Sequence, residues 1–336
     1  MLNLQMITLT NLGGIDMKKY LKSKGVLAVL LSGTLLSGVG LVGCGGGGGG
    51  AGGGGEGSGG GSGSNGGSNV MSAESALTAA YHSMFLSYLD VSGVPTSDGL
   101  CGGGGTISVS REGNTLTITY NNCRYAGQYD EEGMVVGYEW LWNGTIKALI
   151  ENTQGCPMPT RVETLNLKMV IREDRGKDGT WDTDLEYNIS NFVKTHSYTL
   201  DSQCEINSVK VDYSTQGNGS ISITDRVKGD NFTITNLSMT ATLTSTSSSD
   251  KESFSGTMTV TSSCYTASLN IQTLEDFITP IGGDCSTSGK IRITGGTNAT
   301  YISTSTGGIQ IDLGNDGTID KTYNKCSDTF SPICKR

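Results

Sequence analysis

A period of two in the hydrophobic pattern constrains the fold of this chain more than any other feature. Apolar residues alternate with serine and threonine in Thr106–Ser110, Leu116–Tyr120 and Ser220–Thr224, and similar stretches recur as far as Tyr323. Successive side chains of a β-strand point to opposite faces of a sheet, so each stretch predicts a strand with one apolar face and one hydroxyl face. Turns rich in Gly, Asn and Asp separate these stretches, and together they predict roughly fifteen antiparallel strands.

A sheet of that size cannot stay flat and single-faced in water. It must curl, split into two packed layers or close on itself. We therefore expect an all-β domain built on a large, curved antiparallel sheet, either a sandwich or a partly closed barrel. One amphipathic helix is predicted before the strands, over Ser72–Leu89, with Ser72 as N-cap and Glu74 in the first turn. This helix could lie across the concave face of the sheet. Its apolar stripe is Ala73, Ala76, Leu77, Ala80, Tyr81, Met84, Phe85 and Tyr88.

The N-terminal part of the chain has the pattern of a secretory signal. Four lysines between Met17 and Gly25 precede an uncharged apolar run that ends in Leu41-Val42-Gly43-Cys44. These last four residues resemble the lipobox of bacterial lipoproteins, and the resemblance implies that Cys44 becomes the acylated first residue. Gly45 after the cysteine, by resemblance to Gram-negative lipoproteins, implies sorting to the outer membrane, facing the periplasm or the cell exterior. A short transmembrane anchor is the alternative, but the glycines in the run disfavour it.

This signal divides the chain into four parts. Residues 1–16 precede a complete signal, so we expect Met17 to be the true start, and residues 17–43 form the signal peptide. Residues 44–69 hold the lipidated cysteine and a Gly/Ser-rich linker, whose root-mean-square span is roughly 25–30 Å. Residues 70–336 are expected to form a single disulfide-containing β-domain, held at the membrane by its acyl chains.

The charge of the chain excludes one class of partner. The chain has 23 Lys and Arg against 32 Asp and Glu. Removing the residues before Cys44 leaves 19 against 31, a net charge of −12. So acidic a protein is unsuited to bind nucleic acid or an anionic membrane surface. We expect an envelope or surface protein or a glycan as partner, and the lipid anchor as the contact with the membrane.

Eight cysteines remain once Cys44 is set aside for lipid. An even number of cysteines in an exported domain predicts disulfides. A turn at Glu112-Gly113 would place Ile107 opposite Ile118, and Cys101 then lies almost opposite Cys123. For the remaining six cysteines we favour neighbours in the sequence. The predicted pairs are Cys101–Cys123, Cys156–Cys204, Cys264–Cys285 and Cys326–Cys334.

Two nine-residue segments share the pattern D-x-G-x-D-G-T-x-D, and each lies between two predicted strands. The flanking residues set the hairpin registers, with Arg172 opposite Asp184 and Ile309 opposite Tyr323. Aspartates then face one another across each turn, where like charges destabilise a hairpin unless a cation such as calcium binds between them. The alternative is that Asp-Gly only makes the turn. The candidate calcium ligands are Asp174, Asp178, Asp182, Asp312, Asp316 and Asp320.

One strand carries most of the large aromatic side chains of its region. Tyr138, Trp140 and Trp142 share a face with Met134 and Val136. If this face is exposed, the rings form a platform on which sugars or apolar ligands can stack. If it is buried, the same rings anchor the core, which we favour because a sheet with few aromatic residues needs them inside.

No catalytic constellation is present in the sequence. Neither G-x-S-x-G nor H-E-x-x-H occurs. The two histidines are His82, which lies off the centre of the apolar stripe and is expected to be solvated or capped, and His196. We therefore expect a protein that is not an enzyme and has a structural, adhesive or binding role at the envelope. The alternative is a carrier that holds a lipid or another apolar ligand on the concave face of the sheet, which would require an internal apolar cavity.

Overall fold

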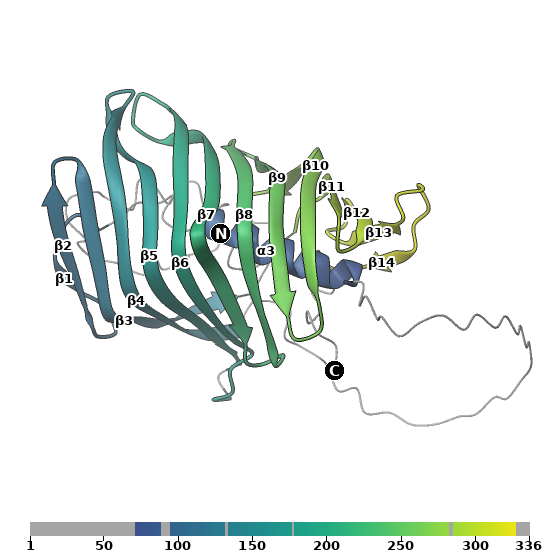
Figure 1. Ribbon diagram of the computed structural model, residues 1–336, viewed down its shortest axis with the longest axis horizontal. Coiled ribbons are helices and arrows are strands. Elements are labelled where there is room, and N and C mark those ends of the chain that lie inside the picture. The colour runs from purple at the N-terminus through teal and green to yellow at the C-terminus, as the bar shows by residue number, and fades with distance from the viewer. Residues whose placement is uncertain (1–70, 89–94, 132–133, 177, 282–284, 327–336) are drawn as a thin grey trace, which may run out of the picture.

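A computed structural model describes residues 71–88, 95–131, 134–176, 178–281 and 285–326. These residues form one helix, α3, and fourteen strands (Figure 1). The elements are α3 (Ala73–Tyr88), β1 (Gly99–Leu100), β2 (Thr106–Glu112), β3 (Thr115–Glu131), β4 (Met134–Thr153), β5 (Cys156–Arg175), β6 (Thr183–Leu200), β7 (Ile206–Asp225), β8 (Asp230–Ser245), β9 (Ser249–Ser262), β10 (Thr266–Pro280), β11 (Ser288–Thr294), β12 (Asn298–Ser303), β13 (Ile309–Leu313) and β14 (Lys321–Tyr323).

The fourteen strands form a single sheet in which each strand pairs with the next along the chain. Every pairing is antiparallel, and the order runs from β1 to β14 without a crossover. The sheet curves around α3 but does not close (Figure 1). The prediction of a large, curved antiparallel sheet is therefore confirmed. The two outermost strands are short, two residues in β1 and three in β14, and so offer little unpaired edge to another chain.

A line of irregularities crosses the long strands and lets them bend. Ladder pairing is interrupted between β3 and β4 at Tyr120/Cys123, and similar interruptions follow in the neighbouring strands. Asn122, Asn191 and Asn236 have positive φ values of 49°, 47° and 49° at these interruptions. Asn is one of the few residues that tolerates this left-handed conformation. Because bulges bend strands and increase their twist, this line contributes to the curvature of the sheet.

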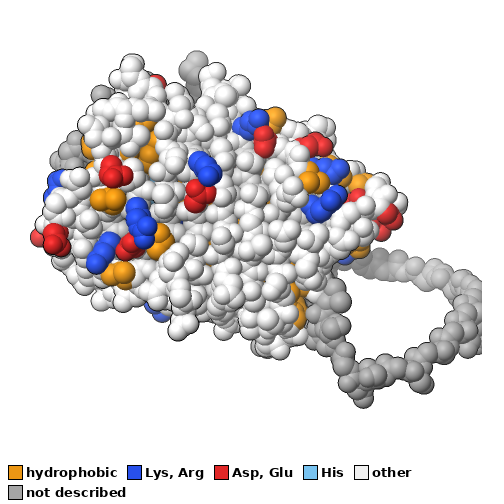
Figure 2. Space-filling model, turned by 45° about the horizontal axis from the view of Figure 1, so that its top comes forward, with side chains coloured by type: hydrophobic (Ala, Val, Ile, Leu, Met, Phe, Trp, Pro, Cys, Tyr) orange, Lys and Arg blue, Asp and Glu red, His pale blue; other side chains and the backbone are white. Residues whose placement is uncertain are grey.

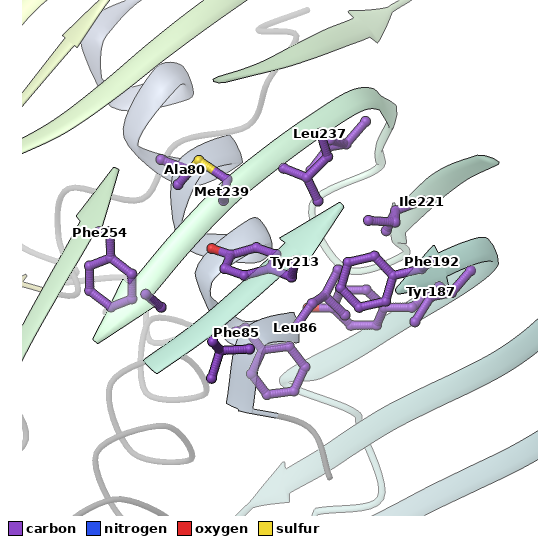
Figure 3. Close-up of a cluster of buried hydrophobic side chains, with 14 of the residues drawn as sticks. Ala80, Phe85, Leu86, Tyr187, Phe192, Tyr213, Ile221, Leu237, Met239 and Phe254 are labelled. Atoms are coloured by element: carbon purple, nitrogen blue, oxygen red, sulfur yellow. The ribbon is translucent and has the colours of Figure 1, made fainter. Parts of the chain in front are cut away.

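The concave face of the sheet packs on α3. Figure 3 shows Ala80, Phe85 and Leu86 of the helix among Tyr187 and Tyr213 of the sheet. The helix starts as predicted, because the hydroxyl of Ser72 accepts a hydrogen bond from the backbone N–H of Ser75 at 3.1 Å. The sheet also fixes this end, since the Tyr301 hydroxyl donates to the carbonyl of Ala73 at 2.6 Å.

The helix is enclosed more completely than its amphipathic pattern predicted. Its polar side chains Ser75, Thr78, Ser83 and Ser87 are buried together with the apolar stripe. Three of the hydroxyls donate to backbone carbonyls of the helix itself, Thr78 at 2.9 Å, Ser83 at 2.7 Å and Ser87 at 2.6 Å. These hydroxyls therefore keep a hydrogen bond when they are buried. For this reason small hydroxyl residues can pack against the sheet on the side of the helix where solvent was expected. No helix among the described residues is long and apolar enough to cross a membrane.

The predicted registers were right in two hairpins and wrong in one. Arg172 lies opposite Asp184, and Ile309 lies opposite Tyr323, as expected. Ile107, however, lies opposite Tyr120 and not opposite Ile118. The turn is centred on Gly113 and the next residue, with φ of 58° at Gly113, so the pairing moves by two residues. A two-residue shift keeps every side chain on its predicted face.

Candidate functional site

The aromatic residues of β4 belong to the inner face. Trp140 and Trp142 are half-buried and pack against the hydrophobic core. The Trp142 ring lies 5.3 Å from the ring of Tyr120, and the Tyr138 ring lies 6.4 Å from that of Trp140. Rings in such tilted contact stabilise one another. The structure thus favours the interpretation that these rings anchor the core. It does not favour the alternative, in which they form an exposed platform for ligands.

The six aspartates proposed as calcium ligands act as acceptors within their own turns. Both carboxylate oxygens of Asp174 accept backbone N–H groups, at 3.2 Å from Asp178 and 3.1 Å from Gly179. Asp182 accepts the N–H of Arg175 at 2.6 Å. In the described residues no group of three or more His, Cys, Asp or Glu side chains is arranged to hold a metal ion.

The second copy repeats this arrangement. Asp312 accepts from the backbone of Asp316 at 3.1 Å and from that of Gly317 at 3.0 Å, and Asp320 accepts from that of Leu313 at 2.6 Å. Carboxylates that receive backbone N–H groups are stabilised without a cation. The shared pattern D-x-G-x-D-G-T-x-D is therefore explained by the turn, and the geometry gives calcium no support.

Two of the four predicted disulfides are present, and the other two predictions were wrong. Cys101–Cys123 and Cys156–Cys204 are bonded as expected. Cys285 bonds to Cys326, across 41 residues, and not to Cys264. Sequence neighbours fail here because both cysteines lie beside Gly307, in the loop between β12 and β13. The N–H of Cys326 donates to the carbonyl of Gly307 at 2.9 Å, and a Cβ added at Gly307 would lie 3.3 Å from the Cβ of Cys285. Cys264 is also disulfide-bonded, and Cys334, like the acylation site Cys44, lies outside the described residues.

The convex face of the sheet is the broad polar surface of the molecule. Figure 2 shows a middle region nearly free of charged and apolar side chains, with charged groups gathered toward two ends of the view. Hydroxyl residues stand side by side on four successive strands of this face, in the row Ser222, Thr233, Thr261 and Thr266. The hydroxyl oxygens of Ser222 and Thr233 lie 3.1 Å apart. This is the hydroxyl face that the alternating sequence predicted.

A groove of about 380 Å³ crosses the convex face over β4, β5, β6 and β7. Three asparagines, Asn143, Asn166 and Asn188, come from three successive strands, and the hydroxyls of Ser190 and Ser220 lie 3.3 Å apart. The remaining lining residues are Gly144, Leu167, Lys168, Ile189 and Ser222. The groove follows the line of strand irregularities, where Gly144 has φ of 138°. It is polar and contains no carboxylate in its lining.

Hydrogen bonds to the backbone orient two of the groove amides. The side-chain oxygen of Asn143 accepts the N–H of Asn122 at 3.2 Å, and that of Asn166 accepts the N–H of Thr145 at 3.0 Å. Each bond fixes the amide oxygen and leaves the NH2 group as the part that can donate to a ligand. Amides held in this way are preorganised for binding.

An ionic network on the convex face holds the one cation of the groove. Glu186 lies 2.9 Å from the ammonium of Lys168 and also pairs with Arg226. Partial burial acts to raise the pKa of Glu186, but hydrogen bonds from Asn188, Lys168 and Arg226 outweigh it and lower the pKa to about 2. Through Arg226 the network continues across the sheet to Asp184, Arg172, Glu139 and Arg124. Lys168 is thus neutralised and positioned, not a free positive charge.

The histidines are buried, contrary to the expectation of a solvated His82. His82 is 8% exposed, and its Nδ1 lies 2.8 Å from the Tyr187 hydroxyl. Burial, with the charge of Lys228, lowers the pKa of His82 to about 3. The reason is geometric, because the sheet wraps the helix and leaves no solvent side for His82. His196, on the concave face of β6, is also buried with a pKa lowered to about 3.

The sequence analysis missed the groove and the ionic network. Asn143, Asn166 and Asn188 lie far apart along the chain, and only the strand registers bring them onto neighbouring strands. The alternating sequence pattern did place each asparagine on the polar face of its strand. Without the pairing of β4, β5 and β6, however, the pattern did not show that the three asparagines lie next to one another.

Comparisons with protein-family models, with curated proteins and with solved structures gave no match for this chain.

Proposed function

We propose that this chain is an outer-membrane-anchored lipoprotein, facing the periplasm or the cell exterior, whose convex face binds a polar polymer such as a glycan. One observation carries the proposal. The helix α3 occupies the concave face, whereas the convex face presents rows of hydroxyl and amide groups, and the charged side chains beside them are joined in ion pairs. Such groups exchange hydrogen bonds with sugar hydroxyls and need no charge on the partner.

The membrane anchor rests on the signal-like segment that ends in Cys44. Acyl chains contribute about 0.8 kcal/mol for each buried methylene, so two or three chains hold a soluble domain at a bilayer. Metabolic labelling with a fatty-acid analogue should mark the wild-type protein and leave Cys44→Ala unlabelled. Equal labelling of both proteins would refute acylation at Cys44 and, with it, the assignment to the outer membrane.

The position of α3 argues against the alternative of a lipid carrier. An apolar ligand on the middle of the concave face would have to displace Phe85 and Leu86 from their contacts with Tyr187 and its neighbours. Native mass spectrometry of the protein extracted from its own membrane separates the two functions. A bound lipid, beyond the acyl chains on Cys44, would favour the carrier.

The binding role is tested with the full-length acylated protein. We expect it to be retained by insoluble neutral polysaccharides and by envelope glycan preparations, and to remain bound as salt is raised. Salt should have little effect because the hydroxyl and amide groups that would bind the polymer are neutral, and screening acts on charged groups. Loss of retention in moderate salt, or no retention on any polysaccharide, would contradict the proposal.

A further inference from the structure

We propose that the groove over β4 to β7 is the binding site for one extended, uncharged β-1,4-linked pyranose chain, which lies across the strands. This inference rests on the proposed function and adds to it a site, a ligand class and an orientation. It is carried by the spacing of the lining groups, by the pairing of the one lining cation with Glu186 outside the lining, and by the amides whose orientation is fixed.

The spacing of the groove matches a chain of sugar units. Its polar groups come from successive strands, Asn143 from β4, Asn166 from β5 and Asn188 from β6. Neighbouring strands lie roughly 4.8 Å apart, which is close to the advance of an extended pyranose chain for each unit. A chain that crosses the strands therefore meets a similar set of groups at each sugar. Three strand intervals, roughly 14 Å, accommodate about three units.

The chemistry of the lining selects an uncharged ligand. The lining residues include no carboxylate, and the single cation, Lys168, is paired with Glu186 at 2.9 Å. The groove therefore presents no unpaired charge, and a charged group on the ligand would find no partner of opposite charge there. Ser190, Ser220 and the amides supply donors and acceptors for sugar hydroxyls. Leu167 and Ile189 border the groove but are buried in the core, so the surface offered to the ligand is polar.

The groove contains no aromatic side chain, so each site should bind weakly. Many copies anchored in one membrane would act together on a long polymer, and multivalent attachment strengthens weak binding without new contacts. An extended polymer is thus a more suitable ligand than a free monosaccharide. We expect affinity to rise up to the trimer and then to level off, because the groove accommodates about three units.

The test uses a pair of substitutions that keep the fold. In Asn143→Asp with Asn166→Asp, an oxygen remains to accept the N–H groups of Asn122 and Thr145, but the NH2 donors are lost and negative charge enters the groove. Asn270→Asp is the matched control, since Asn270 is exposed and lies on β10, away from the groove. The probes are hexamers of β-1,4-linked glucose and of β-1,4-linked N-acetylglucosamine, with an α-1,4-linked glucose hexamer for comparison.

We expect titration calorimetry to show binding of at least one β-1,4-linked hexamer to the wild type and to Asn270→Asp alike. The double variant should bind it at least ten-fold more weakly while melting within a few degrees of the wild type. Equal binding by the double variant, or a preference for the α-linked hexamer, would overturn the site. If no hexamer binds but polysaccharides still retain the wild type, the assignment of the groove as the binding site is wrong, while the proposal that the convex face binds a glycan is kept. If nothing retains the wild type, both fail.

Discussion

Protonation of His82 should destabilise this protein as the pH falls, by an amount that follows from its burial. The imidazole is enclosed between α3 and the sheet, next to the Tyr187 hydroxyl and 5.5 Å from the Phe232 ring. Its pKa is about 3 in the folded protein, against an ordinary value of 6.5. A pKa depressed by folding gives stability that is present above pH 6.5 and is lost as the pH falls toward 3.

The size of the effect can be worked out between pH 7.5 and pH 5.5. Over this range the unfolded chain takes up most of one proton at His82, while the folded protein takes up almost none. The linkage relation then gives a loss of about 1.4 kcal/mol in the free energy of unfolding. For a domain of this size that loss lowers the melting temperature by roughly 3–5 °C.

The assay compares the wild type with His82→Asn in urea unfolding at both pH values. Asn places a neutral polar group near the position of Nδ1 but cannot be protonated in this range. Each protein is compared with itself, so the cost of the substitution cancels. Other buried groups cancel too, including His196 and Glu252, whose pKa is raised to about 7 by burial and by Asp250. If both proteins lose the same stability between the two pH values, His82 is not the buried neutral group described above.

Three further predictions concern the turns, a disulfide and the bend of the sheet. The melting temperature should be the same in millimolar calcium and in chelator, because both oxygens of Asp312 already accept backbone N–H groups; a rise in calcium that Asp312→Ala removes would restore the cation hypothesis. Replacing Cys285 and Cys326 together by Ser should lower the free energy of unfolding in urea by about 2–5 kcal/mol, and an unchanged urea midpoint would argue against this disulfide. Gly144→Ala should cost more than about 1 kcal/mol in the same assay, because an added Cβ at φ of 138° would clash with the carbonyl oxygen of Asn166; wild-type stability would show that the strands need no glycine there.

Local features of the sequence were sufficient where the deciding interaction is itself local. The N-cap at Ser72 and the registers around the two Asp-Gly turns were predicted correctly, because a few neighbouring residues fix them. The Cys101–Cys123 bond was also predicted correctly, although the register assumed for its hairpin was off by two residues. Cys285–Cys326 was missed because its geometry depends on four strands.

The sequence by itself determined the class of the fold. An alternation of period two with regular turns has one physical solution, an antiparallel sheet with one apolar face, and that face must be covered. The sequence also suggested that the helix covers this face, but only the tertiary structure decided how completely the sheet encloses the helix and which polar residues meet on the other face. The wrapping of the sheet around α3 buried His82 and the helix hydroxyls, which the helix pattern had placed in solvent. Asn143, Asn166 and Asn188 became one groove only when their strands paired, because backbone hydrogen bonds set that pairing and single-strand patterns do not reveal it.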